Sequence, residues 1–535
     1  MKVLHLNTFD YSGGAAQGMF ILHKKLINLG IDSILLVQDK VLRDNTIIKI
    51  YDDNEVMIRN NLDTFPTRFY KSGLRIMSNA LIDSPTLIDK IKDINPDIVH
   101  LHWICRALLS VEDIAKINKP IIWTLRDWWP MSGGCHHPLD CNNYQNECGN
   151  CHLIKSADEK DITYQNLLRK KIYIKQKNIT IIGISQQMVN DAKKSSLFKD
   201  FDIRLIYNNV DDTIFHKISP QEAKNNLSIK SNKRIISIGS NNLEDPHKGL
   251  DYFIKALELI SNEKFLILIF GQTNNEFLKK INYDFLYFGY VGKTTLRNIY
   301  CASELFVAPS LFEPFGKTIA EAMLCGTPAI CFKDAGGPSE IISHKKDGYL
   351  ANKYDIQDLA HGIKWILYNK KYKNLSENAI KKIVSNFSAT KIAQEYIHLY
   401  KQKSLENLNK ITNNEFCKGI ECLSKVDNLN LLGNKLNELL SPNKSYVIYG
   451  YGYFGQYLQY ILKKRKIIFI DKDYSKINNT NIFHPSNINN INYDKLIIAV
   501  LNKSQEIKDY LQEIKVQSSK IIDINDLITN ELKII

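Results

Sequence analysis

Two glutamates are the side chains most able to do chemistry in this chain. Glu313 follows an apolar run, and Glu321 lies near the first turn of a helix expected to begin at about Lys317. Carboxylates accept hydrogen bonds from hydroxyl groups, so this pair suits a sugar and a ribose joined to a pyrophosphate.

The elements that must position these residues are buried strands alternating with amphipathic helices. This alternation predicts an α/β fold with parallel sheets covered on both faces. In such sheets ligands bind beyond the carboxyl ends of the strands, where helix N-termini offer free N–H groups to anions. We expect strands at residues 2–7, 32–38, 97–103, 120–125 and 180–185, then at 234–240, 265–271, 285–291, 304–310 and 328–332, and finally at 446–450, 466–471 and 495–500.

The strand pattern restarts twice, so the 535 residues divide into three α/β units. This is consistent with roughly 150 residues per domain. We predict a first lobe at 1–212, a second lobe at 213–404, a polar helical linker at 405–440 and a smaller module at 441–535.

Composition narrows the class of protein. With 44% apolar and 24% charged residues, the chain is not a disordered one. The longest apolar run, 265–270, is strand-sized, and the amino terminus lacks a signal-peptide pattern, so we expect a cytoplasmic protein. The net charge of +13 comes mostly from lysine, because only 11 of the 70 basic residues are arginine. A lysine surplus is weak evidence for nucleic-acid readout; coding bias, an anionic substrate or a membrane surface are the alternatives.

The segment EPFGKTIAEAM, followed by CGTPAI and GGPSEII…DGYL (336–350), resembles retaining glycosyltransferase family 4 of the GT-B fold. The resemblance covers about residues 1–400. It implies two Rossmann-like lobes facing a cleft that binds a nucleotide-diphosphate sugar. It also implies that Glu313 contacts the donor sugar and that Glu321 binds the ribose. Phe315, Gly316 and Lys317 are implied to contact the donor as well, the first two through backbone amides.

Other segments carry the same resemblance. IGSNNLEDPHKGLDYF resembles the strand–loop–helix whose basic residue, here Lys248, holds the donor diphosphate. A lysine at a helix start adds its charge to the helix dipole and offsets the charge of a leaving phosphate. Many family members carry an arginine where this chain has Ser240, so one phosphate contact is missing or comes from elsewhere. Gly289, Tyr290 and Val291 match the turn that lines the nucleobase, and Gly13 and Gly14 match the loop that approaches the phosphates from the opposite lobe.

WTLRDWWPMSGGCHH (123–137) resembles a branch of that family linked to exopolysaccharide assembly, with Arg126-Asp127 at the acceptor side. Arg126 stands where a histidine is common, and a guanidinium cannot act as a general base. Asp127 either positions the acceptor hydroxyl or pairs with Arg126. For His100 and His102 we favour a packing role.

Four of the ten cysteines, Cys135, Cys141, Cys148 and Cys151, cluster in the polar loop 131–153. A disulfide framework is not expected in a cytoplasmic chain. The C-x-x-C ending suits a structural zinc site, with His136, His137 and His152 as substitute ligands; reduced, packed cysteines are the other interpretation. A site of four thiolates leaves no open position for catalysis.

The C-terminal module carries a dinucleotide-binding pattern. Gly450, Gly452 and Gly455 lie between a strand and a helix, and Asp471 ends the next strand. The module is about half the size of a full dinucleotide domain, so it binds NAD(P), a mononucleotide or no ligand. Asp471-Lys472-Asp473 also spells the DxD motif of GT-A glycosyltransferases, an interpretation that the upstream glycines disfavour.

Together these features predict a retaining glycosyltransferase that moves a sugar to a glycan or lipid-linked acceptor in surface polysaccharide biosynthesis. The family's usual account needs no enzyme nucleophile and no divalent metal. We expect the chain to associate with the inner face of the cell membrane, where a lipid-linked acceptor would lie. Nucleic acid is not an expected partner. The alternatives are a GT-B nucleotide-sugar epimerase and, on charge and cysteines alone, a zinc-bearing nucleic-acid adaptor. An oxidoreductase would leave the first 400 residues without a purpose.

Overall fold

A computed structural model gives the fold of the chain in two compact units, residues 1–404 and 405–535. It describes residues 1–70, 78–138, 140–175, 177–423, 435–436, 438–441, 443–450, 455, 458, 462, 466–471, 482–500 and 504–526. No helix within these described ranges is long and apolar enough to cross a membrane.

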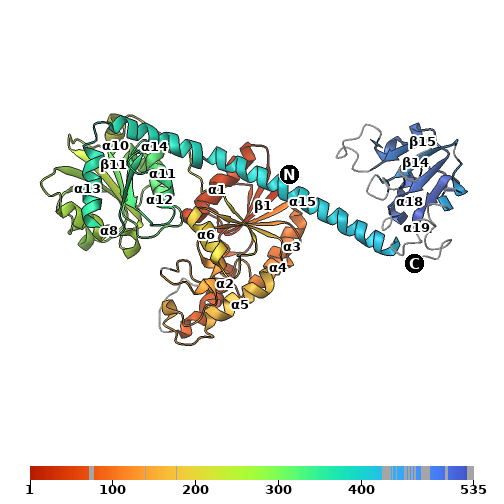
Figure 1. The fold of residues 1–535 in the computed structure, drawn as a ribbon, viewed down its shortest axis with the longest axis horizontal. Coiled ribbons are helices and arrows are strands. Elements are labelled where there is room, and N and C mark those ends of the chain that lie inside the picture. Colours follow the sequence, from red (N-terminus) through yellow and green to blue (C-terminus); the bar gives the residue numbers. More distant parts are fainter. Residues whose placement is uncertain are drawn as a thin grey trace. The chain divides into compact units, whose positions relative to one another are not determined.

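The first lobe is built on a seven-stranded parallel sheet in the order β3-β2-β1-β4-β5-β6-β7. Helices α3 to α6 pack on one face of it, and α1 packs on the other (Figure 1). The strands are β1 Lys2–Phe9, β2 Asp32–Asp39, β3 Ile47–Lys49, β4 Ile98–Leu101, β5 Ile121–Leu125, β6 Ile179–Gly183 and β7 Asp202–Leu205. The helices are α1 Gly13–Asn28, α2 Asp53–Thr64, α3 Pro85–Ile94, α4 Val111–Lys116, α5 Ile162–Ile174 and α6 Gln186–Lys194.

The second lobe is built on a six-stranded parallel sheet in the order β10-β9-β8-β11-β12-β13. Helices α8 and α13 cover one face, while α10, α11 and α14 cover the other. The strands are β8 Arg234–Asn242, β9 Phe265–Gln272, β10 Asp284–Tyr287, β11 Leu305–Ala308, β12 Ala329–Phe332 and β13 Gly348–Ala351. The helices are α7 Pro220–Asn226, α8 Leu250–Glu258, α9 Asn275–Leu278, α10 Lys293–Ala302, α11 Lys317–Leu324, α12 Pro338–Ile341, α13 Ile356–Leu367 and α14 Tyr372–Phe387. These two layered sheets confirm the α/β fold expected from the sequence.

The chain returns to the first lobe after α14. Helix α15, Ala389–Leu423, packs Tyr396 and Tyr400 into an apolar cluster with α1 and the first sheet (Figure 1). The returning segment runs beside the outgoing one: Val210 and Ser388 form a parallel bridge, and the Val210 N–H donates to the Phe387 carbonyl over 3.0 Å.

The second unit has its own five-stranded parallel sheet in the order β16-β15-β14-β17-β18. Its strands are β14 Ser445–Tyr449, β15 Lys466–Ile470, β16 Ile482–Phe483, β17 Lys495–Ile498 and β18 Ile521–Asp523, and its helices include α18 Ser504–Glu513 and α19 Ile524–Asp526. This is the small Rossmann-like module that the sequence predicts.

Candidate functional site

A large cleft opens between the two lobes, at the carboxyl ends of their strands. It holds about 1750 Å³ of space, including space open to solvent. Eight of the predicted donor-site residues line it: Gly13, Gly14, Lys248, Tyr290, Val291, Glu313, Lys317 and Glu321. Four other predicted site residues, Asp127, Gly289, Phe315 and Gly316, are not part of its lining. These eight residues join the start of α1 in one lobe to three segments of the other.

Three helices begin at this cleft without a side-chain cap. The residues before α1, α10 and α11 are Ser12, Gly292 and Gly316, and none of them caps its helix with a side chain. Among helices elsewhere in the same lobes, α5 and α13 are capped by the carboxylates of Asp161 and Asp355, whereas α3 and α14 have no side-chain cap. Uncapped N–H groups together with the positive end of the helix dipole form a site for an anion.

Lys248 and Glu313 form an ion pair in the cleft. The Lys248 ammonium lies 2.6 Å from Oε1 of Glu313, and the Ser310 hydroxyl donates to the same oxygen over 3.2 Å. Burial lowers the pKa of Lys248, but the charges of Glu313 and Asp245 outweigh this and raise it above the ordinary lysine value. Lys248 is therefore a cation that is held in place before any ligand arrives.

The backbone of the Glu313 loop is fixed by the glycine segment that follows β12. The Glu313 N–H donates to the Ala335 carbonyl over 3.0 Å, and its own carbonyl accepts from the Gly337 N–H over 3.1 Å. A Cβ on Gly337 would lie 2.5 Å from the Cα of Phe315, so only glycine allows this approach. Phe315 itself is 3% exposed and packs in the core. Within the described part of the chain, the N–H groups of Phe315 and Gly316 have no acceptor.

Glu321 and Lys317 lie one turn apart on α11, at the floor of the cleft. Burial raises the pKa of Glu321, against the opposing effect of Lys317. Burial also lowers the pKa of Lys317 to about 8, although Glu321 raises it. The Lys317 ammonium donates to Oε1 of Gln17 over 2.8 Å, so it bridges the two lobes.

Lys293 is a cleft residue that the sequence analysis missed. It opens α10, lies 3.3 Å from Oδ2 of Asp211, and stacks over the ring of Tyr11 at 5.1 Å. Burial lowers the pKa of Lys293, yet Tyr11 and Asp211 together raise it above the ordinary value. Lys293 directly follows Gly292 at a helix start. A lysine beside a glycine at an expected helix start was also the pattern around Lys248, so this pattern could have identified Lys293 from the sequence.

The opposite end of the cleft is formed by the turn after β10. The strand expected at 285–291 ends at Tyr287, so Gly289, Tyr290 and Val291 form the turn itself. Gly289 has φ +63°, which glycine adopts without strain, and Tyr290 is 70% exposed. Ser240 also lines the cleft, where its hydroxyl donates to the Asn242 carbonyl.

Asp127 pairs with a histidine rather than with Arg126. Its Oδ2 lies 2.7 Å from Nδ1 of His136 and accepts from the indole N–H of Trp103 over 2.7 Å, while Oδ1 accepts from the Trp129 N–H. Burial raises the pKa of Asp127, but His136 and the other donors lower it below the ordinary value. The pairing of Asp127 with Arg126, one of the two interpretations of the sequence, is therefore wrong.

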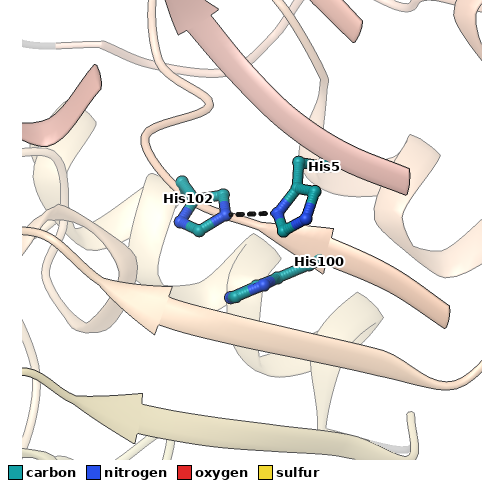
Figure 2. A group of neighbouring side chains, drawn as sticks. All are labelled: His5, His100 and His102. Carbon is teal, nitrogen blue, oxygen red and sulfur yellow. Dashed lines mark hydrogen bonds between the residues drawn. The ribbon is translucent and has the colours of Figure 1, made fainter. Parts of the chain in front are cut away.

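Arg126 instead joins a buried network of histidines, of which Figure 2 shows His5, His100 and His102. Its Nη1 donates to Oδ1 of Asn208 over 2.8 Å, and its Nη2 lies 3.1 Å from Nδ1 of His102. Because a guanidinium only donates, His102 carries its proton on Nε2, which donates to Nδ1 of His5 at 3.0 Å.

These histidines also form the one group within the described residues whose ligand atoms all lie within 4.8 Å of one another: His5, His100 and His102. Burial holds the pKa of each well below 6.5. The nitrogens of His100 face the hydroxyls of Tyr400 and Thr124. The adjacent guanidinium and these hydrogen bonds favour a neutral network over a metal centre, as the packing role expected for His100 and His102 requires.

The four clustered cysteines line one pocket and are free thiols. The Cys148 sulfur accepts from the Gly133 N–H over 3.3 Å, and backbone N–H groups of Leu153 and Ile154 face the Cys151 sulfur. Burial and, to a lesser degree, the neighbouring thiols raise the pKa of Cys135 to about 12. The cluster is thus assembled and supplied with N–H donors, although its sulfur atoms do not reach the spacing of the histidine group. The structural zinc stays a prediction.

The glycine pattern of the second unit lies partly outside the described residues, because Gly452 does. Gly450 has φ +99°, and a Cβ on Gly455 would lie 2.0 Å from the Gly450 carbonyl oxygen. The backbone of Gly455 therefore lies directly against that of Gly450. Asp471 follows β15, where its N–H donates to the Phe483 carbonyl. A nucleotide at these residues stays a prediction.

Comparison with known proteins agrees with this geometry. Residues 220–382 match the family model for glycosyl transferases group 1, and residues 443–522 match the model named C2185-like, N-terminal. An uncharacterized glycosyltransferase of Methanocaldococcus jannaschii is 24% identical over 331 residues, covering 57% of this chain and 82% of the relative. An uncharacterized protein in the cps region of Klebsiella pneumoniae is 26% identical over 343 residues, covering 63% and 87%.

Solved structures share the fold of the two lobes. Sucrose-phosphate synthase from Thermosynechococcus elongatus superposes with a TM-score of 0.55 at 17% identity, covering 75% of this chain and 99% of that one. HepE from Anabaena, solved in complex with UDP-glucose, gives 0.54 at 16% identity and covers 75% and 100%. These likenesses confirm the GT-B arrangement of two facing parallel sheets.

Proposed function

We propose that this protein, a retaining glycosyltransferase with the GT-B fold and a C2185-like C-terminal domain, transfers a sugar from a nucleotide-diphosphate sugar to a glycan or lipid-linked acceptor. The observation that carries the proposal is the pair Lys248–Glu313, 2.6 Å apart, in a cleft lined by uncapped helix starts. An anion-binding wall beside a fixed carboxylate suits a diphosphate attached to a hydroxyl-rich ring.

Each part of the donor has matching groups. The diphosphate lies against Lys248, Lys293 and the N-termini of α1, α10 and α11, with Lys293 supplying the charge that Ser240 lacks. Glu313 accepts hydrogen bonds from the sugar, and the N–H groups of Phe315 and Gly316 donate to it. Glu321 accepts from the ribose, and Tyr290 and Val291 contact the base.

The reaction needs no enzyme nucleophile in this arrangement. The bond between the anomeric carbon and the diphosphate breaks, and its electron pair stays on the diphosphate oxygen. The acceptor oxygen bonds to the same face of that carbon, and its hydroxyl proton passes to the departing diphosphate. Lys248 stabilises the charge that develops on the leaving oxygen, which is where a fixed cation contributes most.

A surface polysaccharide is the proposed product class. The relative in the cps region of Klebsiella pneumoniae and the segment around Asp127 support it. The net charge of +13 suits contact with an anionic membrane surface, where a lipid-linked acceptor would lie.

The test is a panel of UDP-, GDP- and ADP-sugars screened by thermal shift, because a ligand of the native state raises the melting temperature. Turnover of the best donor is then measured in Lys248→Ala and Glu313→Gln, with Lys255→Ala on the exposed face of α8 as control. We expect each site variant to lose about 100-fold or more, and the control to keep wild-type turnover. Full turnover in either site variant, or no stabilising sugar nucleotide, would contradict the proposal. Conversion of the donor to its epimer without acceptor would identify an epimerase.

A further inference from the structure

A second cavity adjoins the donor cleft at the Lys248–Glu313 pair. It holds about 330 Å³, including space open to solvent, and is lined by His137, Asp245, His247, Lys248, Phe312 and Glu313. Lys248 and Glu313 line both spaces. The cleft on one side of the pair contains the uncapped helix starts, and the smaller pocket on the other side contains two imidazoles and an aromatic ring. The pocket therefore opens onto the reacting end of the proposed donor, away from its nucleotide.

The pocket is built by contact between the lobes. His137 comes from the cysteine-rich loop of the first lobe, and the other five residues come from the second lobe. The rings of Trp128 and Phe312 lie 4.7 Å apart, and His137 meets Phe312 edge-on at 6.1 Å. Trp128 is 1% exposed, and its indole N–H donates to Oδ2 of Asp191 over 3.0 Å. A rigid ring thus holds His137 and Phe312 against one another.

The residue before His137 is fixed even more tightly. Nδ1 of His136 lies 2.7 Å from Oδ2 of Asp127, and the His136 ring stacks on Trp103 at 5.4 Å. The backbone carbonyl of His136 accepts from the Trp128 N–H over 3.0 Å. This gives Asp127 a positioning role: the carboxylate is largely buried and holds the loop that presents His137. The His137 side chain itself is exposed to the pocket.

The chemistry of the lining matches a sugar ring. A pyranose presents hydroxyls at its edge and C–H groups on its face, so it needs planar polar partners beside an apolar ring. The pocket offers imidazoles and carboxylates around Phe312. We propose that this pocket is the acceptor subsite, in which a pyranose packs on Phe312 and His137 accepts a hydrogen bond from the hydroxyl that receives the transferred sugar. This inference rests on the proposed function.

The geometry gives the hydroxyl a direct path to the donor. Held at His137, it lies in a pocket whose wall is the pair that orients the donor sugar and its leaving group. As the carbon–diphosphate bond breaks, the oxygen bonds to the anomeric carbon. The O–H rotates from His137 to the departing diphosphate oxygen, which takes the proton.

The test separates donor hydrolysis from transfer. Nucleotide release from the donor identified by thermal shift is measured in water alone and with p-nitrophenyl pyranosides of glucose, galactose, mannose and N-acetylglucosamine. Binding of these pyranosides in the presence of UDP is followed by saturation-transfer NMR. The proteins compared are wild type, His137→Ala, His137→Asn, Phe312→Ala and, as a matched control, His361→Ala on the outer helix α13.

We expect at least one pyranoside to bind and to become glycosylated. His137→Ala and Phe312→Ala should lower the pyranoside-dependent rate about 10-fold or more and leave donor hydrolysis within about 2-fold, since each removes acceptor contacts alone. His137→Asn should keep part of the rate, and His361→Ala all of it.

Two results would overturn the inference. A parallel loss of donor hydrolysis in His137→Ala would assign the pocket to the donor sugar. Failure of every pyranoside to bind, while the donor is hydrolysed, would exclude a carbohydrate acceptor here. If no sugar nucleotide stabilises the protein, the proposed function fails instead, and NMR binding of pyranosides to wild type and His137→Ala still decides the ligand of the pocket.

Discussion

The ammonium of Lys248 lies 2.6 Å from Oε1 of Glu313, although 65 positions separate the two residues in the chain. They meet because Lys248 follows β8 and Glu313 follows β11, and these strands are neighbours in the second sheet. In a parallel sheet the loops after neighbouring strands lie at the same edge. Each residue is thus positioned by its own loop and held in place by the charge of the other.

This pair should behave as one unit in turnover. We expect Lys248→Met and Glu313→Gln each to lose about 100-fold or more, and the double variant to be little worse than the poorer single one, because both act at one reacting centre. Melting temperatures should change little, since both side chains are about one-quarter exposed (26% and 24%) and solvent screens the pair. Initial rates and calorimetric melting of the four proteins test this; fully additive losses would contradict it.

Nucleotide affinity should fall as pH rises through about 8, the pKa to which burial lowers Lys317. An anionic diphosphate in the cleft favours the protonated lysine and raises its pKa, so the complex takes up a proton above pH 8. Affinity is therefore complete below that pH and decreases by at most about tenfold per pH unit above it. Titration calorimetry of UDP in buffers of different ionisation enthalpy measures the uptake. Lys317→Met should remove the dependence, and an equal slope in that variant would exclude Lys317 as its source.

Gly14→Ala should separate stability from donor binding. Gly14 has a helical backbone, and a Cβ there would meet no atom within 4 Å, so alanine should leave folding unchanged or stabilise it by about 0.5 kcal/mol. The added methyl lies where the diphosphate approaches, so the KM of the donor should rise several-fold. Gly18→Ala gives the opposite result: its Cβ would lie 2.7 Å from Oδ1 of Asn208, and stability should fall. An unchanged KM in Gly14→Ala would move the phosphates away from α1.

Tyr290→Ala should weaken nucleotide binding without loss of stability. The ring is 70% exposed in the absence of ligand, so its removal takes little from the core. Stacking of a base on an aromatic ring contributes about 1–3 kcal/mol, which corresponds to roughly 5- to 150-fold in the Kd of UDP. Tyr354→Ala, another exposed tyrosine of the second lobe, is the control. Equal Kd values for wild type and Tyr290→Ala would place the base elsewhere.

The cysteine pocket should contain one zinc ion per chain. Four deprotonated thiols form a tetrahedral ligand set for zinc, and the N–H donors that face the sulfurs of Cys148 and Cys151 offset part of the excess negative charge. Elemental analysis of purified protein should find zinc, and Cys148→Ser or a chelator should remove it and lower the melting temperature. Cys105→Ser, in the core of the same lobe, should retain the metal. Metal-free protein with four titratable thiols would show that the cysteines are merely packed.

The central strands of all three sheets could be predicted from the sequence, and most of the edge strands could not. β3, β7, β13, β16 and β18 all lie at an edge and have two to four residues each. A central strand is buried on both faces and needs a continuous apolar run, whereas an edge strand such as β7, at residues 202–205, is partly exposed and carries no such signal.

Most residues on the donor side of the site could be predicted from the sequence, because glycines and charged residues at strand ends can be recognised from the local sequence. The residues on the acceptor side could not be predicted in this way. The partner of Asp127 is His136, fixed by the course of a loop, and His137 reaches the pocket only because Trp128 meets Phe312 from the other lobe. The return of α15 onto the first lobe also depends on tertiary packing, since nothing in residues 389–404 distinguishes one lobe from the other.

The bridge between Val210 and Ser388 determines how the two lobes can move. The chain passes between the lobes twice, and the two passages are hydrogen-bonded to each other at this point. A single connection would allow the lobes to rotate about several axes. Two connections that are hydrogen-bonded to each other restrict that rotation. Any rotation of one lobe against the other therefore involves this paired connection, which lies far along the chain from both His137 and the Lys248–Glu313 pair.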